Sequence, residues 1–450
     1  MQKINPQVFR AYDIRGIYKK DIDENLFRKI GFVLGKKGKK FLVGHDIRES
    51  SESLALALIE GLILKDSKVY FGGETFFGLC FFSGSFLKVS KTLFVTASHL
   101  PPEWNGLKIN FGDGEPISSK EIQRIKSEVL KTKNINPPKK LVFAKVNFEK
   151  EYIEKLLEFF PELKRKSLKI VVDCGNGSTS LLAPKIFKEL GFKVVKLFCE
   201  PNPFFPNRAS EPTFEATKTL REKVKKTKAD FGVAFDGDGD RAVIVDDKGR
   251  YLGGNEIGTI LVREILREEK NKKVVKTIAT TMRIDEEVKK AKGKLIEVPV
   301  GHTFVIKTVK KEKAIFGIEE SGHAVLSNYF LFDDAMLIPL KVAQILIKRK
   351  KKLSEIVEKT KFYLTETLSF ECPDEKKFDV IKKMANNLKK KFKKISTLDG
   401  LKIYFDFGWV LFRASNTSPK IKAYFEVKTK EKLKKLKEIF SKEIEKWIKQ

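Results

Sequence analysis

The sequence predicts an α/β protein of four domains, in which three related α/β domains with mixed, largely parallel sheets precede a C-terminal α+β domain. Three stretches repeat one order: a short β-branched or aromatic run, a glycine-rich or polar loop, an amphipathic helix and a second apolar run. Strands that alternate with helices in this way favour βαβ units. After residue 362 the order changes to strand, helix, strands and helix, which favours an antiparallel sheet. The length of 450 residues fits two to four domains.

The expected elements follow from the apolar periodicity of each stretch. The three α/β stretches are predicted to contain strands at 41–44, 69–71, 169–173, 194–195, 274–278 and 295–298, with helices at 54–59, 181–190 and 284–291. The C-terminal stretch is predicted to contain strands at 363–370, 400–407, 409–412 and 420–427, a turn at 399–400, a helix at 378–392 and a final helix.

The domain boundaries are expected near residues 145, 250 and 362. The predicted domains are 1–145, 146–249, 250–362 and 363–450. Because no low-complexity linker separates them, we expect the domains to pack closely and to share a central cleft, a common place for ligand sites.

The amino-acid composition limits the classes of protein to which this chain can belong. With 42% hydrophobic and 11% aromatic residues the chain has enough apolar surface for packed cores, which argues against disorder or a coiled coil. The longest uncharged apolar-rich stretch, 75–87, is too short to span a bilayer, so no membrane partner is expected. The 4 cysteines are scattered without a C-x-x-C pair, which predicts neither a zinc site nor a disulfide framework and favours a reducing, cytoplasmic compartment.

The net charge of +31 raises the one alternative from a different functional class, a basic nucleic-acid-binding protein. Lysines interleaved with glutamates, as in 431–438, are typical of solvated helix faces, and no stretch resembles an RNP motif. Nucleic acid is therefore not an expected partner.

The most specific local motif is Asp-Gly-Asp-Gly-Asp-Arg at 236–241. Acidic residues at i, i+2 and i+4 project to one side of an extended loop, and three carboxylates suit a hard divalent ion such as Mg²⁺. An EF-hand is excluded because Arg241 stands at its glycine position and Asp247 at its glutamate position. A simple Asp-Gly hairpin turn would leave three acids repelling one another.

A second motif is Thr-Ala-Ser-His-Leu-Pro-Pro at 96–102, directly after the apolar run 93–95. A serine at the end of a buried strand is placed where a reactive hydroxyl would sit, although a lone serine in a loop is weak evidence. His99 is not expected to reach the hydroxyl of Ser98 as a triad base. Lys108, ten residues on, could supply a cation to the site.

Two further polar loops lie at 317–323 and 413–419. Glu319, Ser321 and His323 offer donors and acceptors suited to sugar hydroxyls. The second loop contributes a guanidinium, hydroxyls and an amide suited to phosphate, from Arg413, Ser415, Asn416 and Thr417. Either loop alone could be an ordinary capped turn. Together with the aspartates they imply a site that handles a phosphate, a metal and a polyol.

Five blocks of the sequence resemble the α-D-phosphohexomutase family, of the bacterial phosphomannomutase/phosphoglucomutase type. They occur in the family's order along the chain, at 9–16, 96–108, 236–241, 317–323 and 413–419. The resemblance implies a heart-shaped four-domain enzyme in which each domain contributes a loop to a central cleft. It implies interconversion of hexose 1-phosphate and hexose 6-phosphate, of mannose and/or glucose, through a phosphoserine and a bisphosphorylated sugar. It also implies one Mg²⁺ per chain, glucose or mannose 1,6-bisphosphate as activator, phosphosugars as partners, and a monomer or homodimer.

The resemblance assigns roles to individual residues. Ser98 matches the phosphoserine, whose phosphate also touches the metal, and the Mg²⁺ ligands match Asp236, Asp238 and Asp240. The catalytic groups that orient the phosphoserine or assist proton transfer match Arg15, His99, Lys108 and Arg241. Substrate-binding residues match Tyr12, His302, Glu319, Ser321 and His323, and the clamp on the second phosphate matches Arg413, Ser415, Asn416 and Thr417.

The chain departs from the family's pattern at several positions. Leu100 stands where Asn is usual, Ser418 where many members have Glu, His45 where Arg is common, and 75–77 replaces a Pro-Thr-Pro turn. The Leu100 change concerns the geometry of the serine loop rather than the nucleophile. Asn416 favours hexose enzymes over phosphoglucosamine mutase, which remains the alternative.

Overall fold

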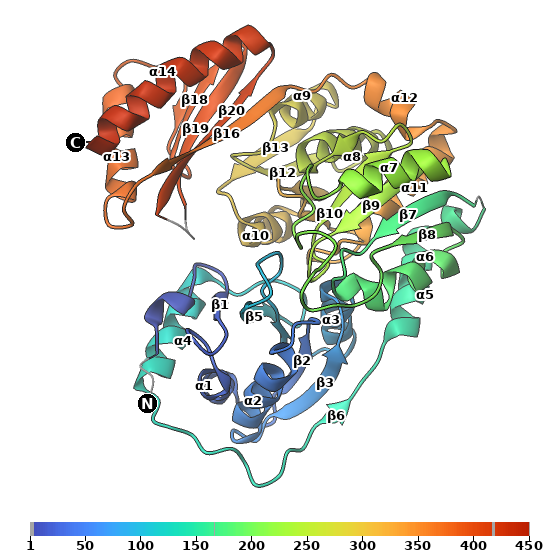
Figure 1. The fold of residues 1–450 in the computed structure, drawn as a ribbon, viewed down its shortest axis with the longest axis vertical. Helices are drawn as coiled ribbons and strands as arrows, with labels where there is room; N and C mark the ends of the chain where they lie inside the picture. The colour runs from blue at the N-terminus through green and yellow to red at the C-terminus, as the bar shows by residue number, and fades with distance from the viewer. Residues whose placement is uncertain (1–3, 166, 416–418, 450) are drawn as a thin grey trace.

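The computed structural model describes residues 4–165, 167–415 and 419–449. Over these residues the chain forms four consecutive domains, each with its own sheet, which confirms the predicted fold class. Figure 1 shows domain I in blue below, domains II and III in green and yellow beside each other, and domain IV in orange and red above. No helix of the described residues is long and apolar enough to cross a membrane.

Domain I holds a mixed sheet in the order β1-β5-β4-β2-β3-β6. Strands β4, β2, β3 and β6 are parallel neighbours, whereas β5 runs antiparallel to both β4 and β1. Its elements are η1 (Pro6–Val8), β1 (Ile14–Ile17), α1 (Glu24–Leu34), β2 (Lys40–His45), α2 (Ser51–Ile63), β3 (Lys68–Glu74), α3 (Phe77–Phe86), β4 (Lys91–Val95), β5 (Trp104–Phe111), α4 (Ser119–Lys131) and β6 (Ala144–Lys145). The segment with β6 runs along the outside of the molecule from domain I to domain II (Figure 1).

Domain II repeats the arrangement with the order β11-β10-β9-β7-β8, in which β9, β7 and β8 are parallel. Its elements are α5 (Glu149–Phe159), η2 (Pro161–Arg165), β7 (Lys169–Asp173), η3 (Ser178–Leu181), α6 (Ala183–Glu189), β8 (Lys193–Leu197), α7 (Lys218–Thr227), β9 (Phe231–Phe235), β10 (Ala242–Asp246) and β11 (Tyr251–Leu252). The helix predicted at 181–190 is the end of η3 followed by α6.

Domain III has the order β13-β12-β14-β15, again with parallel strands next to one antiparallel strand. Its elements are α8 (Gly254–Glu268), β12 (Lys273–Thr277), α9 (Met282–Lys290), β13 (Lys294–Val298), α10 (His302–Glu312), β14 (Phe316–Ile318), β15 (Ala324–Leu326), α11 (Leu337–Arg349) and α12 (Leu353–Glu358).

Domain IV has an antiparallel sheet in the order β16-β20-β19-β18-β17. Its elements are β16 (Leu364–Glu371), α13 (Lys377–Leu388), β17 (Ile395–Ser396), β18 (Leu401–Phe405), β19 (Gly408–Ala414), β20 (Lys420–Val427) and α14 (Lys430–Lys449). The strand β17 was missed by the sequence pattern. The turn predicted at 399–400 joins β17 to β18, and the reversal between β18 and β19 occurs at Asp406 and Phe407.

One local arrangement recurs in the three α/β domains. The loop that joins a parallel strand to the following antiparallel strand carries a polar motif: 96–103 between β4 and β5, 236–241 between β9 and β10, and 319–323 between β14 and β15. In domain IV the corresponding loop joins β19 to β20. The fold therefore places each motif at the end of a buried strand, where side chains are held precisely.

One apolar core is shared between domains I, II and III, and domain I has a second core of its own. One cluster of buried side chains includes Phe76 and Phe94 from domain I, Phe187 and Phe235 from domain II, and Leu340 from domain III. Domain IV has a separate core between its sheet and helices α13 and α14. It meets domain III through a small apolar cluster in which Ile278 and Ala279 pack against Trp409 and Leu411.

A buried carboxyl group connects domains II and III. Asp334 Oδ2 accepts hydrogen bonds from the hydroxyls of Tyr152 (2.8 Å) and Tyr329 (3.0 Å), and Asp334 Oδ1 accepts one from the Met336 amide (3.0 Å). Its side chain approaches helix α3 so closely that a Cβ on Gly78 would lie 2.5 Å from Oδ1. Burial raises the pKa of Asp334 to about 6.

This raised pKa predicts a pH-dependent stability difference between the wild type and Asp334→Asn. The folded protein binds a proton at Asp334 at a pH where the unfolded carboxyl, with a pKa of about 4, is ionised. The stability of the wild type relative to the variant should therefore increase by about 2 kcal/mol as pH falls from 7 to 4. Urea unfolding of both proteins across this range measures the difference. A difference that stayed constant with pH would contradict the prediction.

Candidate active site

A cavity of about 480 Å³ collects polar side chains from the four domains. Of the residues predicted from the sequence, its walls include Tyr12, Arg15, Ser98, His99, Lys108, Asp240, Arg241, His302, Glu319, Ser321, His323, Arg413 and Ser415. Asp236 and Asp238 are fully buried next to this wall. Asn416, Thr417 and Ser418 lie outside the described residues. The structure thus brings together motifs that are spread over more than 300 residues of the sequence.

Ser98 lies directly after β4 in a strained loop. Its φ of 52° is left-handed, a conformation that costs an L-residue about 1 to 2 kcal/mol. The Ser98 amide donates to Thr96 Oγ1 (2.8 Å), and the Ser98 hydroxyl donates to Asp236 Oδ2 (3.1 Å). The loop therefore turns the hydroxyl away from domain I and toward the aspartates of domain II.

Arg48, which sequence analysis did not select, holds the serine loop in place. Its guanidinium is buried and pairs with Asp46 Oδ2 (3.0 Å). It donates hydrogen bonds to the backbone carbonyl oxygens of Ser98 (2.9 Å), Leu100 (2.7 Å), Pro101 (2.5 Å) and Trp104 (3.0 Å). Because Leu100 contributes its carbonyl to this clamp, the loop is fixed through its backbone at the position where the sequence departs from the family.

Replacing Arg48 by Met should destabilise the protein by about 3 to 5 kcal/mol, because Asp46 and the loop carbonyls would be left buried without their partner. Displacement of the loop by even about 1 Å should also lower kcat by about 100-fold. Urea unfolding and steady-state kinetics measure the two effects. Arg124→Met is the control, since Arg124 forms an exposed pair with Glu128 and its loss should cost about 0.5 kcal/mol or less. Equal stability of the two variants would contradict this role for Arg48.

The three aspartates form a compact group of oxygen donors. A carboxylate oxygen from each of Asp236, Asp238 and Asp240 lies within 4.8 Å of the others. Asp236 Oδ1 accepts from the backbone amides of Gly239, Asp240 and Arg241, each at 3.1 Å, which fixes the loop. Within the described residues, Asp238 Oδ1 and Asp240 Oδ1 are buried without a hydrogen-bond partner. Buried carboxylate oxygens without partners fit a hard divalent cation.

A glycine allows the serine loop (residues 96–103) and the aspartate loop (residues 236–241) to contact each other. A Cβ built on Gly237 would lie 2.4 Å from the Ser98 carbonyl oxygen, so a side chain at this position would push the two loops apart. The close contact between domains I and II thus depends on the glycine at 237 as well as on the acidic residues.

Buried cations surround the hydroxyl and the carboxylates. The ammonium of Lys108 donates to Asp238 Oδ2 (2.8 Å) and to Asp240 Oδ2, and Arg241 Nε donates to Asp236 Oδ2 (3.0 Å). Burial lowers the pKa of Lys108, but Asp238 and Asp240 outweigh it and raise that pKa, so the amine is charged. These two cations offset two of the three carboxylate charges, which leaves net negative charge for a divalent cation to meet.

His99 lies closer to the serine hydroxyl than the sequence predicted. Its Nδ1 atom is 3.4 Å from Ser98 Oγ, so the expectation that it would not reach the hydroxyl is wrong. Burial and the positive charges of Arg241 and Arg15 lower the pKa of His99 far below its usual range. The imidazole is therefore neutral and able to accept a hydrogen bond. The left-handed backbone at Ser98 permits this contact between adjacent side chains.

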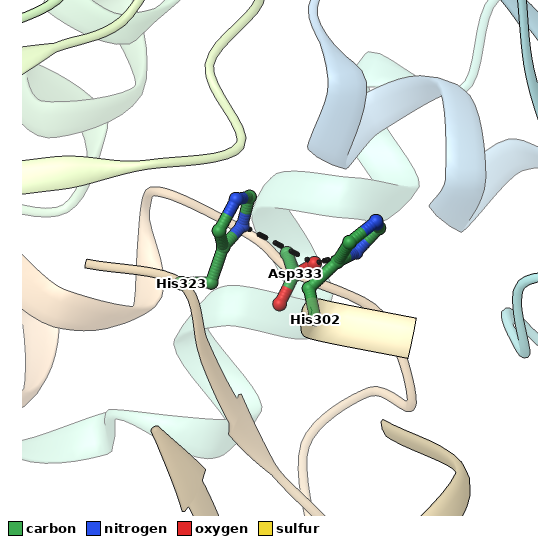
Figure 2. A group of neighbouring side chains, drawn as sticks. All are labelled: His302, His323 and Asp333. Atoms are coloured by element: carbon green, nitrogen blue, oxygen red, sulfur yellow. Dashed lines mark hydrogen bonds and ion pairs between the residues drawn. The ribbon is translucent and has the colours of Figure 1, made fainter. Parts of the chain in front are cut away.

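Two histidines on the domain III side share one carboxylate (Figure 2). His302 Nδ1 lies 2.7 Å from Asp333 Oδ2, and His323 Nδ1 lies 3.3 Å from the same oxygen. The rings stack with their centroids 5.0 Å apart. Burial would lower the pKa of His323, but Asp240 and Asp333 raise it to about 9. Asp333 follows β15 without any recognisable motif, so the sequence did not predict it as a site residue.

Glu319 and Arg413 bring domains III and IV to the same cavity. Glu319 is buried, and its Oε1 accepts from the Gly301 amide (2.8 Å), while burial raises its pKa to about 7. Arg413 Nε donates to Asp399 Oδ2 (2.7 Å), which also accepts from the Val300 amide (2.9 Å). This carboxylate anchors the guanidinium of domain IV to the backbone of domain III.

Comparisons with known proteins agree with this architecture. Sequence profiles described as phosphoglucomutase/phosphomannomutase α/β/α domains I, II and III match residues 6–136, 150–249 and 253–363, and the profile of the C-terminal domain of these enzymes matches 368–443. A phosphoglucomutase/phosphomannomutase of Thermococcus kodakarensis is 33% identical, over 98% of this chain and 99% of the relative. A protein of Methanothermobacter thermautotrophicus named "Probable phosphoglucosamine mutase" is also 33% identical, over 97% of this chain and 98% of the relative.

A solved structure extends the agreement to three dimensions. The crystal structure of a phosphoglucomutase/phosphomannomutase family protein from Burkholderia thailandensis superimposes with a TM-score of 0.90 at 26% identity, covering 99% of this chain and 98% of that one. With its domain order, its motif-bearing loops and its near full-length relatives, the chain belongs to the phosphoglucomutase/phosphomannomutase family of phosphohexomutase enzymes.

Proposed function

We propose that the protein interconverts the 1-phosphate and 6-phosphate of a hexose, mannose and/or glucose, through a phosphorylated Ser98. The observation that carries the proposal is the position of Ser98. Its hydroxyl lies at the cavity wall, 3.1 Å from Asp236 Oδ2, and Lys108 lines the same cavity. The cavity is also lined by side chains that are suited to bind a sugar and a phosphate, among them Glu319 and Arg413. Phosphoryl transfer depends on positioning and charge neutralisation, and this arrangement supplies both.

The reaction consists of two phosphoryl transfers. In the first, a free sugar hydroxyl attacks the phosphorus on Ser98, the P–Oγ bond breaks, and the hydroxyl proton passes to the released Ser98 Oγ. The bisphosphorylated sugar then turns over in the cavity. In the second transfer Ser98 Oγ attacks the other phosphate and returns its proton to the sugar oxygen, so atoms and charge balance. His99, whose Nδ1 lies 3.4 Å from Ser98 Oγ, would accept a hydrogen bond from this hydroxyl and orient it.

The remaining residues bind and orient the substrate. Asp236, Asp238 and Asp240 would hold Mg²⁺, which when bound neutralises negative charge on the phosphoryl oxygens. Lys108, Arg15 and Arg241 surround Ser98 with fixed positive charge. Sugar hydroxyls would meet Glu319, Ser321, His323 and His302, and the second phosphate would meet Tyr12, Arg413, Ser415, Asn416 and Thr417. Glucose or mannose 1,6-bisphosphate would serve as the activator that phosphorylates Ser98.

An assay of the purified protein with Mg²⁺ and the bisphosphate activator tests this proposal. Mannose 1-phosphate and glucose 1-phosphate should each be tested for conversion to the 6-phosphate. Conversion of at least one is the expected result, and conversion of neither would overturn the proposal.

Glucosamine phosphate is the alternative substrate, because relatives of similar identity carry the name phosphoglucosamine mutase. The same assay with glucosamine 6-phosphate separates the two functions by kcat/KM. A value at least tenfold higher for glucosamine than for either hexose would assign the chain to the alternative.

A further inference from the structure

Two cysteines of domain II lie in contact although 25 positions separate them in the sequence. Cys174 follows β7 and Cys199 follows β8, and these strands are parallel neighbours in which Asp173 pairs with Leu197. The Cys174 amide donates to the Leu197 carbonyl (3.2 Å), so the strand pairing continues to the first cysteine. The Sγ atoms are 3.1 Å apart, and both side chains are buried.

This separation leaves little movement before a bond can form. A disulfide requires about 2.05 Å between the sulfur atoms, so the two atoms need to approach by only about 1 Å. The other cysteines of the chain, Cys80 and Cys372, are buried in domains I and IV.

We propose that Cys174 and Cys199 are a disulfide site, which closes when the protein meets a low-molecular-weight disulfide such as oxidised glutathione. Cys199 is the more exposed residue of the two, at 8% against 1% for Cys174. Its thiolate attacks the glutathione disulfide, forms a mixed disulfide and releases one glutathione thiolate. Cys174 then loses its proton and attacks Cys199 Sγ, and the second glutathione thiolate leaves. Two protein thiols are oxidised, one glutathione disulfide is reduced, and the two protons go to the two released thiolates.

A hydrogen bond between the thiols supports this order of events. The Cys174 thiol, acting as donor, lowers the pKa of Cys199, whereas burial raises the pKa of Cys174. The more exposed cysteine is therefore also the one that ionises more readily, and the thiolate is the attacking species.

The cross-link would strengthen the support of the aspartate loop. The Cys174 carbonyl accepts from the Gly177 amide (2.9 Å), and the Ser178 amide of the same turn donates to the Gly237 carbonyl (2.9 Å). A bond to Cys199 ties this turn to the end of β8. Neither cysteine lines the substrate cavity, so we expect thermal stability to rise without loss of activity.

Oxidation of the wild-type protein with glutathione disulfide, followed by unfolding and alkylation with iodoacetamide, tests the proposal. Two of the 4 cysteines should escape alkylation, and tryptic peptide mapping should recover the cross-linked peptides that contain Cys174 and Cys199. The oxidised protein should melt about 5 °C higher than the reduced protein, and dithiothreitol should reverse the shift. Cys199→Ser should abolish the shift, and Cys372→Ser, a buried cysteine of another domain, should retain it.

Three outcomes would overturn the proposal: alkylation of all 4 cysteines after oxidation, glutathione retained on Cys199, or a cross-link to a different cysteine. The thiol count on the wild-type chain decides the matter even if Cys199→Ser fails to fold. Because thiols are counted without an activity assay, this test is independent of the proposed reaction.

Discussion

Ser98→Ala is expected to lower kcat by about 10⁴-fold or more on every phosphosugar that the wild type converts. The variant has no oxygen at the position that contacts Asp236 and His99, so no phosphoryl group can be held there between the two transfers. Intact-mass measurement after incubation with the bisphosphate activator should show one added phosphate on the wild type and none on the variant. The folded structure should persist, since Ala removes only the hydroxyl.

A buried serine elsewhere in domain I provides the matched control. Ser83 donates its hydroxyl to the Leu79 carbonyl within α3 (2.7 Å), away from the cavity. Ser83→Ala should therefore retain both kcat and the added phosphate. If Ser98→Ala still accepted a phosphate and kept wild-type kcat, the nucleophile would have to be another residue.

Asp238→Asn is expected to weaken Mg²⁺ binding by about 100-fold or more and to lower kcat by about 10³-fold at limiting metal. The substitution removes a negative charge and replaces one carboxylate oxygen by an amide nitrogen, which costs the site either the oxygen that lacks a partner or the acceptor of the Lys108 hydrogen bond at 2.8 Å. Isothermal titration with Mg²⁺ measures the binding change directly, and kinetics at several metal concentrations measure the loss of activity.

The control for this variant is Asp230→Asn, also in domain II. Asp230 accepts from the Lys169 amide (2.7 Å) and lies apart from the aspartate group, so metal affinity should be unchanged. Wild-type Mg²⁺ affinity in Asp238→Asn would argue that the cation binds elsewhere.

The sequence predicts those parts of the fold and site that short segments encode. Apolar runs such as 169–173 and 274–278 are recognisable as buried strands, and the polar loops that follow strands carry compact motifs. Ser98 and the aspartates are found in this way, because residue type and local spacing already indicate their chemistry.

The residues that were missed act through contacts distant in sequence. Arg48 binds carbonyls about 50 positions away, and Asp333 joins histidines that lie 31 and 10 positions before it. Cys174 and Cys199 meet only because β7 and β8 are parallel neighbours. Strand order decides each of these contacts, and no local pattern encodes it. In domain IV the turn predicted at 399–400 lies between the antiparallel strands β17 and β18, and only β17 was missed, because two residues are too few for a recognisable apolar pattern.

The shared apolar core of domains I, II and III affects which domains can separate from one another most easily. Separating any of these domains from its neighbours exposes side chains of the shared core, so their mutual contacts should be lost cooperatively. Domain IV keeps its own core and contacts domain III through a small cluster and a few polar groups, among them Arg413 with Asp399. The least costly separation in the described structure therefore runs between domains III and IV. It opens the cavity from the side of Arg413 and leaves Ser98 and the aspartates undisturbed.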